Sequence, residues 1–218
     1  MTGTDTENLA AWNQIQRGLE FSGEQIANRL RLLAVGLFYA IHVLNWYGLS
    51  VGVKIIPPLA HQDPQFHARI TLIVVAWVML SLGLMLALHH RIFPCWLKYL
   101  STGIDLLFLA SVLLIADGPS SASVVGLFVI VSLSAIRFDL GLIRCTVAGA
   151  GIVFALLVYY ARTMATPAKE IDVTNAQAMM LLAALLMEGI VLGQLIRRVR
   201  HTAMFYADRI VRAEKTDA

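Results

Sequence analysis

Six long apolar stretches constrain the fold of this chain more than any other feature of its sequence. A membrane-spanning helix needs about 20 mostly apolar residues to cross roughly 30 Å of hydrocarbon, where every backbone hydrogen bond has to be made within the protein. The stretches that fit this length, two of them only with their flanks, are 32–53, 70–88, 97–115, 121–136, 145–160 and 178–196. The sequence therefore predicts an all-α integral membrane protein with six transmembrane helices in a bundle.

The composition leaves little room for anything besides these spans. Of 218 residues, 58% are hydrophobic and 14% are charged, far from the balance of a soluble domain. This composition excludes a large attached water-soluble catalytic domain. The net charge of +3 is attributed to membrane topology, so the expected partner is the lipid bilayer and no nucleic-acid partner is expected.

Lysine and arginine are distributed unevenly between the two sides of the predicted bundle. An even number of spans puts both termini on one side, and 13 of the 17 Lys and Arg residues fall on that side. Cytoplasmic segments carry the excess of positive charge in membrane proteins. Both termini are therefore predicted to lie in the cytoplasm.

The first 31 residues are predicted to form a cytoplasmic helical segment. Apolar residues recur at the spacing of an interfacial amphipathic helix, at Leu9, Trp12, Ile15 and Leu19. The alternative is a frayed polar tail. Ser22 and Gln25 have the spacing of a capping box, which predicts that a second helix starts near Gly23 and runs into the first span. Arg29 and Arg31 are then expected at the lipid headgroups.

The last span is predicted to continue as a cytoplasmic helix over 197–218. Apolar residues recur at the spacing of a short coiled-coil seam, at Ile196, Val199, Ala203, Tyr206, Ile210 and Ala213. Inside the span, Gly189 and Gly193 form a GxxxG pair, which either brings two helices close together or arises by chance. The two patterns predict a homodimer through this helix and a division of the chain into 1–31, 32–196 and 197–218.

The order of these features resembles the six-helix membrane input modules that precede the catalytic domains of many bacterial sensor histidine kinases and class III nucleotide cyclases. The segments that carry the resemblance are Arg29-Leu-Arg31-Leu-Leu-Ala, Gly103-Ile-Asp105-Leu-Leu, Leu133-Ser134-Ala135-Ile136-Arg137-Phe138 and Gly193-Gln194-Leu-Ile-Arg197-Arg198. The resemblance implies a sensor in the bacterial cytoplasmic (inner) membrane. No phospho-acceptor helix, ATP-binding glycine box or cyclase aspartate pair is present, so the resemblance implies a free-standing module, a fragment, or a subunit that acts on a separate effector protein.

Three ionisable residues interrupt the apolar spans at similar predicted depth. They are His42 in the first span, Asp105 in the third and Glu188 in the sixth. Ionisable residues within a membrane are costly and usually face protein or water. One hypothesis is that the three meet in a proton-binding or ligand-binding cluster that biases the sixth helix. The alternative is that each is neutral and hydrogen-bonded to a neighbour, and serves only helix packing.

No enzyme, metal or cofactor site is predicted. The sequence contains no HExxH, GxSxG, P-loop or dinucleotide fingerprint. Cys95 and Cys145 lack the spacing of a zinc site, and only His42 lies deep enough in a span to ligate haem, which needs two such histidines for bis-His ligation. His61 and His67, in the loop after the first span, are expected to be solvated rather than metal-bound.

Two functions remain open on the sequence alone. The first is a membrane-embedded sensor or signal-transducing module that relays a signal through the last helix to a partner, which the heptad extension favours. The second is a small proton-coupled or cation-coupled transporter or channel subunit, which the intramembrane His and acids favour. No internal repeat supports the second.

Overall fold

Every regular element that the computed structural model describes is a helix. It describes residues 3–46, 64–90, 94, 96–116, 118–163 and 174–216. The α-helices are α1 (Gly3–Trp46), α2 (Pro64–His89), α3 (Leu97–Ile115), α4 (Val125–Ile136), α5 (Leu140–Thr163) and α6 (Asn175–Thr216), and two 3-10 helices, η1 (Gly118–Ser120) and η2 (Ala122–Val124), precede α4. The predicted all-α class is confirmed.

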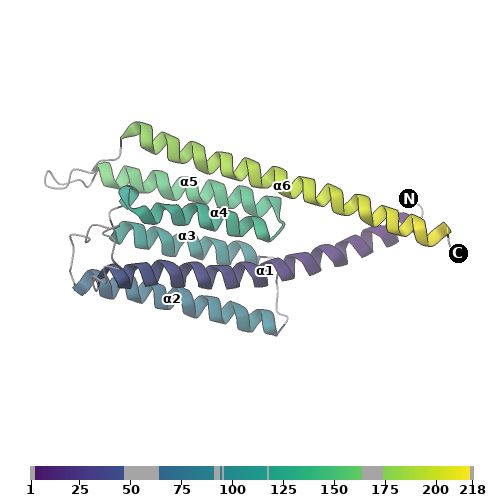
Figure 1. The fold of residues 1–218 in the computed structure, drawn as a ribbon, viewed down its shortest axis with the longest axis horizontal. Helices are drawn as coiled ribbons and strands as arrows, with labels where there is room; N and C mark the ends of the chain where they lie inside the picture. Colours follow the sequence, from purple (N-terminus) through teal and green to yellow (C-terminus); the bar gives the residue numbers. More distant parts are fainter. Residues whose placement is uncertain are drawn as a thin grey trace.

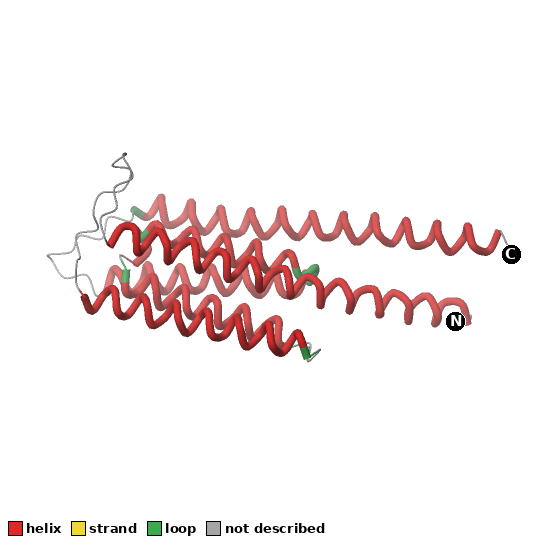
Figure 2. Tube along the Cα trace, turned by 60° about the horizontal axis from the view of Figure 1, so that its bottom comes forward, coloured by secondary structure: helices red, strands yellow, loops and turns green. Residues whose placement is uncertain are grey.

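The helices form an elongated bundle from which two arms project (Figures 1 and 2). α1 packs on α2 and α4, α3 packs on α2, α4 and α5, and α6 packs on α4 and α5. The first part of α1 and the last part of α6 leave the bundle at the same end, called here the arm end, where α4 ends and α5 begins. The opposite end, where α1 ends and α2 begins, is called the far end.

Within the described residues, five helical segments are long and apolar enough to cross a membrane, which identifies a membrane protein. They are Phe21–Leu44, Pro64–His89, Leu97–Ile115, Leu140–Thr163 and Asn175–Ala203. The predicted fourth span is a shorter apolar helix, Ala122–Ile136. These helices expose apolar side chains that are compatible with contact with lipid hydrocarbon. Leu72 of α2 and Met179 of α6, for example, are 72% and 70% exposed.

The start of the first span differs from its prediction. α1 is one continuous helix of 44 residues, so the helix start predicted near Gly23 is wrong. No proline interrupts this segment, and glycine inside a helix is tolerated at a cost of about 1 kcal/mol. Its apolar segment begins at Phe21, so Arg29 and Arg31 belong to the span rather than to its flank, and Arg31 is buried. The side chains of the amphipathic stripe, Leu9, Trp12, Ile15 and Leu19, lie outside the described residues.

The apolar core joins α3, α4, α5 and α6. Its most buried members are Leu113, Leu127, Val131, Ala150, Phe154 and Leu185. Small residues let these helices approach: a Cβ added at Gly126 or Gly149 would lie 2.8 Å from a side-chain atom of α3. α1 contributes no residue to this core cluster. The position of α1 therefore depends on other contacts.

Gly23 is a point where the backbone of α1 comes very close to the backbone at the end of α4. A Cβ at this position would lie 2.6 Å from the carbonyl oxygen of Ile136, whereas a Cβ at Gly36 of the same helix would meet no atom within 4 Å. We expect Gly23→Ala to lower the stability of the purified protein by about 1–3 kcal/mol, because backbone has to shift. Gly36→Ala, as the control, should leave the stability unchanged or raise it by up to about 1 kcal/mol. Thermal unfolding in detergent checks this, and equal Tm values for the two variants would contradict it.

Candidate functional site

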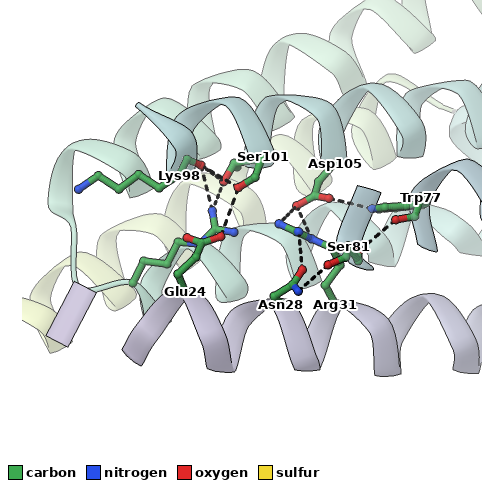
Figure 3. Close-up of polar contacts among 10 residues, drawn as sticks. Glu24, Asn28, Arg31, Trp77, Ser81, Lys98, Ser101 and Asp105 are labelled. Atoms are coloured by element: carbon green, nitrogen blue, oxygen red, sulfur yellow. Dashed lines mark hydrogen bonds and ion pairs between the residues drawn. The ribbon is translucent and has the colours of Figure 1, made fainter. Parts of the chain in front are cut away.

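A network of buried charged side chains lies at the arm end of the bundle, between α1, α3 and the turn at 137–139 that joins α4 to α5. Figure 3 shows Glu24, Asn28 and Arg31 pointing from α1 toward residues of α3 and α2. The three residues follow one another at spacings of four and three, which puts them on one face of the helix. We call this set of contacts the arm-end network.

Arg31 and Asp105 form the first ion pair of the network. Arg31 Nη2 and Nε lie 2.7 and 3.0 Å from Asp105 Oδ2, and the two side chains are 2% and 4% exposed. The indole N–H of Trp77, on α2, donates to Asp105 Oδ1 at 2.8 Å. Arg31 also donates to Asn28, whose amide donates to the carbonyl of Ser81 at 2.9 Å. These contacts tie α1 to α2 and α3 at one point.

Glu24 and Arg137 form the second ion pair. Arg137 Nε lies 2.8 Å from Glu24 Oε2, and the side chains are 2% and 0% exposed. Arg137 donates a further hydrogen bond to the carbonyl of Lys98 at 3.1 Å and another to the hydroxyl of Thr102. Ser101 donates to Glu24 Oε1 at 3.4 Å. Burial lowers the pKa of Arg137, and the Glu24 carboxylate opposes that shift.

Lys98 and Asp139 form the third ion pair, at the start of α5. Lys98 Nζ lies 2.6 Å from Asp139 Oδ2, and the Tyr99 hydroxyl donates to the same oxygen at 3.2 Å. Asp139 Oδ1 accepts from the backbone N–H groups of Gly141 and Leu142, so Asp139 caps α5. Burial by itself raises the pKa of Asp139, but the Lys98 ammonium and the two N–H groups outweigh burial and hold this pKa below its usual range.

The arm-end network balances its charge. It contains three acids and three bases, namely Glu24, Asp105, Asp139, Arg31, Lys98 and Arg137. A buried charge without a partner costs several kcal/mol, and removing one member of a buried pair typically costs about 3–5 kcal/mol. The network is therefore stable as a neutral unit and is sensitive to any change that separates its members.

The 137–139 turn also contacts α6. Arg200 of α6 donates to the carbonyl oxygen of Phe138 at 2.7 Å. Phe138 has a φ of 53°, in the left-handed region that a non-glycine residue rarely adopts, and this conformation depends on the surrounding contacts. Through Arg137, Phe138 and Asp139 the turn is thus bonded to α1, to α6 and to α3.

The structure does not bring His42, Asp105 and Glu188 into one cluster. His42 Nε2 lies 3.1 Å from His67 Nδ1, near the far end. Asp105 belongs to the arm-end network, and Glu188 Oε1 accepts from the Ser132 hydroxyl of α4 at 2.7 Å. Each acid or imidazole has its own partner on a neighbouring helix. Binding of a proton or ligand by each of the three stays a prediction.

The residues predicted to form a dimer seam on α6 fall into two groups. A Cβ at Gly189 would lie 2.5 Å from Val147 Cγ2 of α5, and Ile196 is buried, so both pack within the chain. Val199 and Ala203 are exposed, and a Cβ at Gly193 would meet no described atom within 4 Å. The side chains of Tyr206, Ile210 and Ala213 lie outside the described residues.

The sequence points to Asp105 but not to most of its surroundings. Glu24 and Arg31 lie in the segment predicted as a cytoplasmic flank, although with Asn28 they form a polar stripe at helical spacing, which is a signal that such a face is buried against other polar groups. Arg137 follows directly after the predicted fourth span, 121–136. Its partner is on α1, 113 positions away by sequence number, and no local pattern indicates such a pairing.

Comparison of the chain with protein-family models, with curated proteins and with solved structures finds no match. The resemblance to six-helix input modules therefore stays a prediction from the sequence. Within the described ranges, no group of three or more His, Cys, Asp or Glu side chains is placed to hold a metal ion.

Removal of the Asp105 charge should destabilise the protein by leaving Arg31 unpaired. We expect Asp105→Asn to cost about 3–5 kcal/mol, because the Arg31 guanidinium stays buried without a counter-charge. The double variant Arg31→Met with Asp105→Asn should recover most of this loss, since the amide oxygen still accepts from Trp77. Ser111→Ala, which removes a hydroxyl bonded only to its own helix, is the control. Thermal unfolding in detergent provides the comparison, and additive effects of the two single changes would contradict the pairing.

Asp139→Asn should remove a stabilisation that depends on pH. Asn caps helices about as well as Asp, so the variant keeps the α5 cap and loses the ion pair with Lys98. The folded state lowers the pKa of Asp139, so its contribution to stability is present above the usual value, about pH 4, and is lost as the pH falls through the lowered pKa. The difference in Tm between the natural chain and the variant should therefore shrink on acidification. A difference that is the same at neutral and acid pH would contradict this assignment.

Proposed function

We propose that this chain is a membrane-embedded signal-transducing module without its own catalytic domain, which relays a signal from the membrane through α6 to a partner. One observation carries this proposal. The 137–139 turn is bonded both to α1, through Arg137 and Glu24, and to α6, through Phe138 and Arg200. These two helices are the ones that continue past the bundle as arms (Figure 1).

Such a connection suits a relay because it joins two continuous helices through a few specific contacts. α1 and α6 are continuous helices of 44 and 42 residues, so a shift at one end of either helix moves the other end. The buried ion pairs favour one position of α1, since any position that separates the charges is costly. A stimulus that favours a second position of α1 would change the 137–139 turn and, through Arg200, the direction of α6. A relay of this kind is a shift between two populations.

The distribution of polar side chains supports relay over transport. A proton or cation path needs polar groups or water from one face of the membrane to the other. The arm-end network ends at Asp105 and Trp77, beyond which α3 buries Leu109 and Leu113 in the apolar core, and Glu188 forms a separate pair with Ser132. The charged groups of the arm-end network pair with one another at one end of the bundle, so their role is to hold the helices in position.

We infer that both arms lie in the cytoplasm of a bacterial cell and that α4 completes six spans. Both arms leave the bundle at one end, which requires an even number of crossings. Ala122–Ile136 would cross about 22 Å as a helix, which needs a locally thinned bilayer. The exposed arginines Arg144, Arg197 and Arg198 lie within a few residues of the arm-end limits of their spans, which is where the positive-inside rule expects the charges of a cytoplasmic face.

The partner that we propose for α6 is a second copy of the chain, which then presents its paired arms to an effector protein. α6 is the least covered of the spanning helices, and Val199 and Ala203 stay exposed where it leaves the bundle. Ile196 and Gly189 are used within the chain, so the dimer contact that we propose begins beyond them.

Arg200→Met tests the relay with a matched control. In full-length protein in native membranes, with Cys95 and Cys145 replaced by serine, single cysteines at position 199 or 203 should form disulfide cross-links between copies. Loss of the Arg200 hydrogen bond to Phe138 should change the rate of cross-linking several-fold, because α6 is freed from the turn. Arg198→Met removes the same charge from an exposed neighbouring position and should leave the rate unchanged.

Two results would count against the relay. Equal cross-linking rates in both variants would mean that the turn does not control α6. Proton or cation flux in liposomes that depends on Asp105, with cross-linking absent, would favour the transporter.

A further inference from the structure

His42 and His67 form a pair at the far end that the relay does not yet explain. His42 Nε2 and His67 Nδ1 lie 3.1 Å apart, within the range of a hydrogen bond between two imidazoles. The ring centroids are 5.3 Å apart and the ring planes differ by 14°. In an imidazole each nitrogen lies just over an ångström from the centroid of its ring. The two nitrogens therefore lie close to the line that joins the centroids, and the two rings are nearly coplanar and meet nitrogen to nitrogen.

This head-to-head geometry suits a proton better than a metal ion. The lone pair of one nitrogen points at the other nitrogen, so a single hydrogen between them satisfies both. Two imidazoles that share a metal ion direct their lone pairs at a common third point, which nearly coplanar rings facing each other do not. We propose that His42 and His67 form a proton-binding site in which the two rings share one hydrogen and that loss of this sharing is the input of the relay.

The surroundings favour a pair that carries one positive charge. The indole of Trp46 lies against His67 with centroids 4.8 Å apart, and Phe66 lies 5.8 Å from His42. Aromatic faces stabilise a nearby cation. His42 and His67 lie close to the ends of their apolar segments, at Leu44 and Pro64, so protons from the aqueous phase can reach them.

Among the described residues, other ionisable groups of α1 and α2 near this end have partners of their own. On α1, the Tyr39 hydroxyl bonds to the Thr71 hydroxyl at 3.1 Å, and on α2, the exposed Arg69 bonds to Gln65. The stretches 106–116 and 122–136, described toward this end, contain no charged residue. Glu24, Arg31 and Asp105, which α1 also contacts, are paired with one another or with Arg137 at the arm end. Within the described part of the chain, the ionisable group bonded to each imidazole is therefore the other imidazole.

A second proton would break the pair. With no proton or one proton added, one nitrogen still accepts the hydrogen of the other. When both rings are protonated, both facing nitrogens carry hydrogen, the bond is lost and two positive charges repel at close range. The end of α1 would then move away from α2. Because α1 is one helix, this movement reaches Glu24 and Arg31 in the arm-end network. This last step rests on the proposed relay, whereas the proton site does not.

Histidine titration by nitrogen NMR tests the proton site in full-length protein in lipid nanodiscs. The pair should take up its two protons in separate steps. His67→Gln should abolish the separate steps and leave a single step for His42, and His42→Gln should leave a single step for His67. His89 is exposed at the other end of α2. His89→Gln is the control and should leave the pair unchanged. Titration of His42 that is the same with and without His67 would overturn the site.

A nitroxide at position 199 separates the site from the relay. If both hold, its spectrum should change over the pH range of the second protonation, and this change should be absent from His67→Gln and present in His89→Gln. Stepwise titration of the pair without any change at position 199 would support the proton site while overturning the relay. A pH-dependent change at position 199 that persists in His67→Gln would show that another group provides the input, and would overturn the input role of the pair.

Discussion

A charge inside the bundle needs a counter-charge, and the arrangement of this protein depends on that requirement. α1 contributes no residue to the apolar core that joins α3, α4, α5 and α6. Its depth and its rotation are set instead by Glu24 and Arg31, whose partners are on the 137–139 turn and on α3. Apolar packing tolerates small rotations of a helix because apolar contacts have no preferred direction. An ion pair whose two carboxylate oxygens are both bonded does not tolerate such rotations. The bundle thus has an apolar core, which holds α3, α4, α5 and α6 to one another, and a polar end, which fixes α1.

The sequence predicted the spanning helices well because the length of an apolar stretch can be read from consecutive residues, without knowledge of distant contacts. The third span, 97–115, has the same bounds in sequence and structure, and the two after the short fourth differ only at their ends. The first span was misplaced because Glu24, Asn28 and Arg31 are polar residues that normally mark a flank. They belong to the span only because their partners compensate them, and Asp105 is 74 positions from Arg31. Asp105 itself was found, since it interrupts an apolar run, but its partner was not. The separate positions of His42, Asp105 and Glu188 likewise depend on which faces of the helices meet, which a similar depth in three spans does not determine.

α1 connects the two ends of the molecule, as α6 also does. It carries His42 near the far end, Glu24 and Arg31 at the arm end, and an arm beyond the bundle (Figure 2). α6 contacts the same turn from the other side through Arg200. The two arms therefore share one small structural element, the 137–139 turn, whose left-handed Phe138 depends on contacts from its neighbours. The position of α1 and the conformation of the turn are coupled because the Glu24–Arg137 ion pair belongs to both.

The pairing of α1 with later parts of the chain also constrains how the protein is made. The charged residues of the first span emerge from the ribosome before their partners, since Asp105 and Arg137 come much later in the sequence. A charge within a span opposes its insertion, by up to about 2.5–3.5 kcal/mol at mid-membrane and by less toward either end. The first span is therefore expected to stay near the insertion machinery, or at the membrane surface, until α3 and the 137–139 turn have been synthesised. Insertion of this protein would then be completed by the late pairing of its first helix rather than helix by helix in the order of translation.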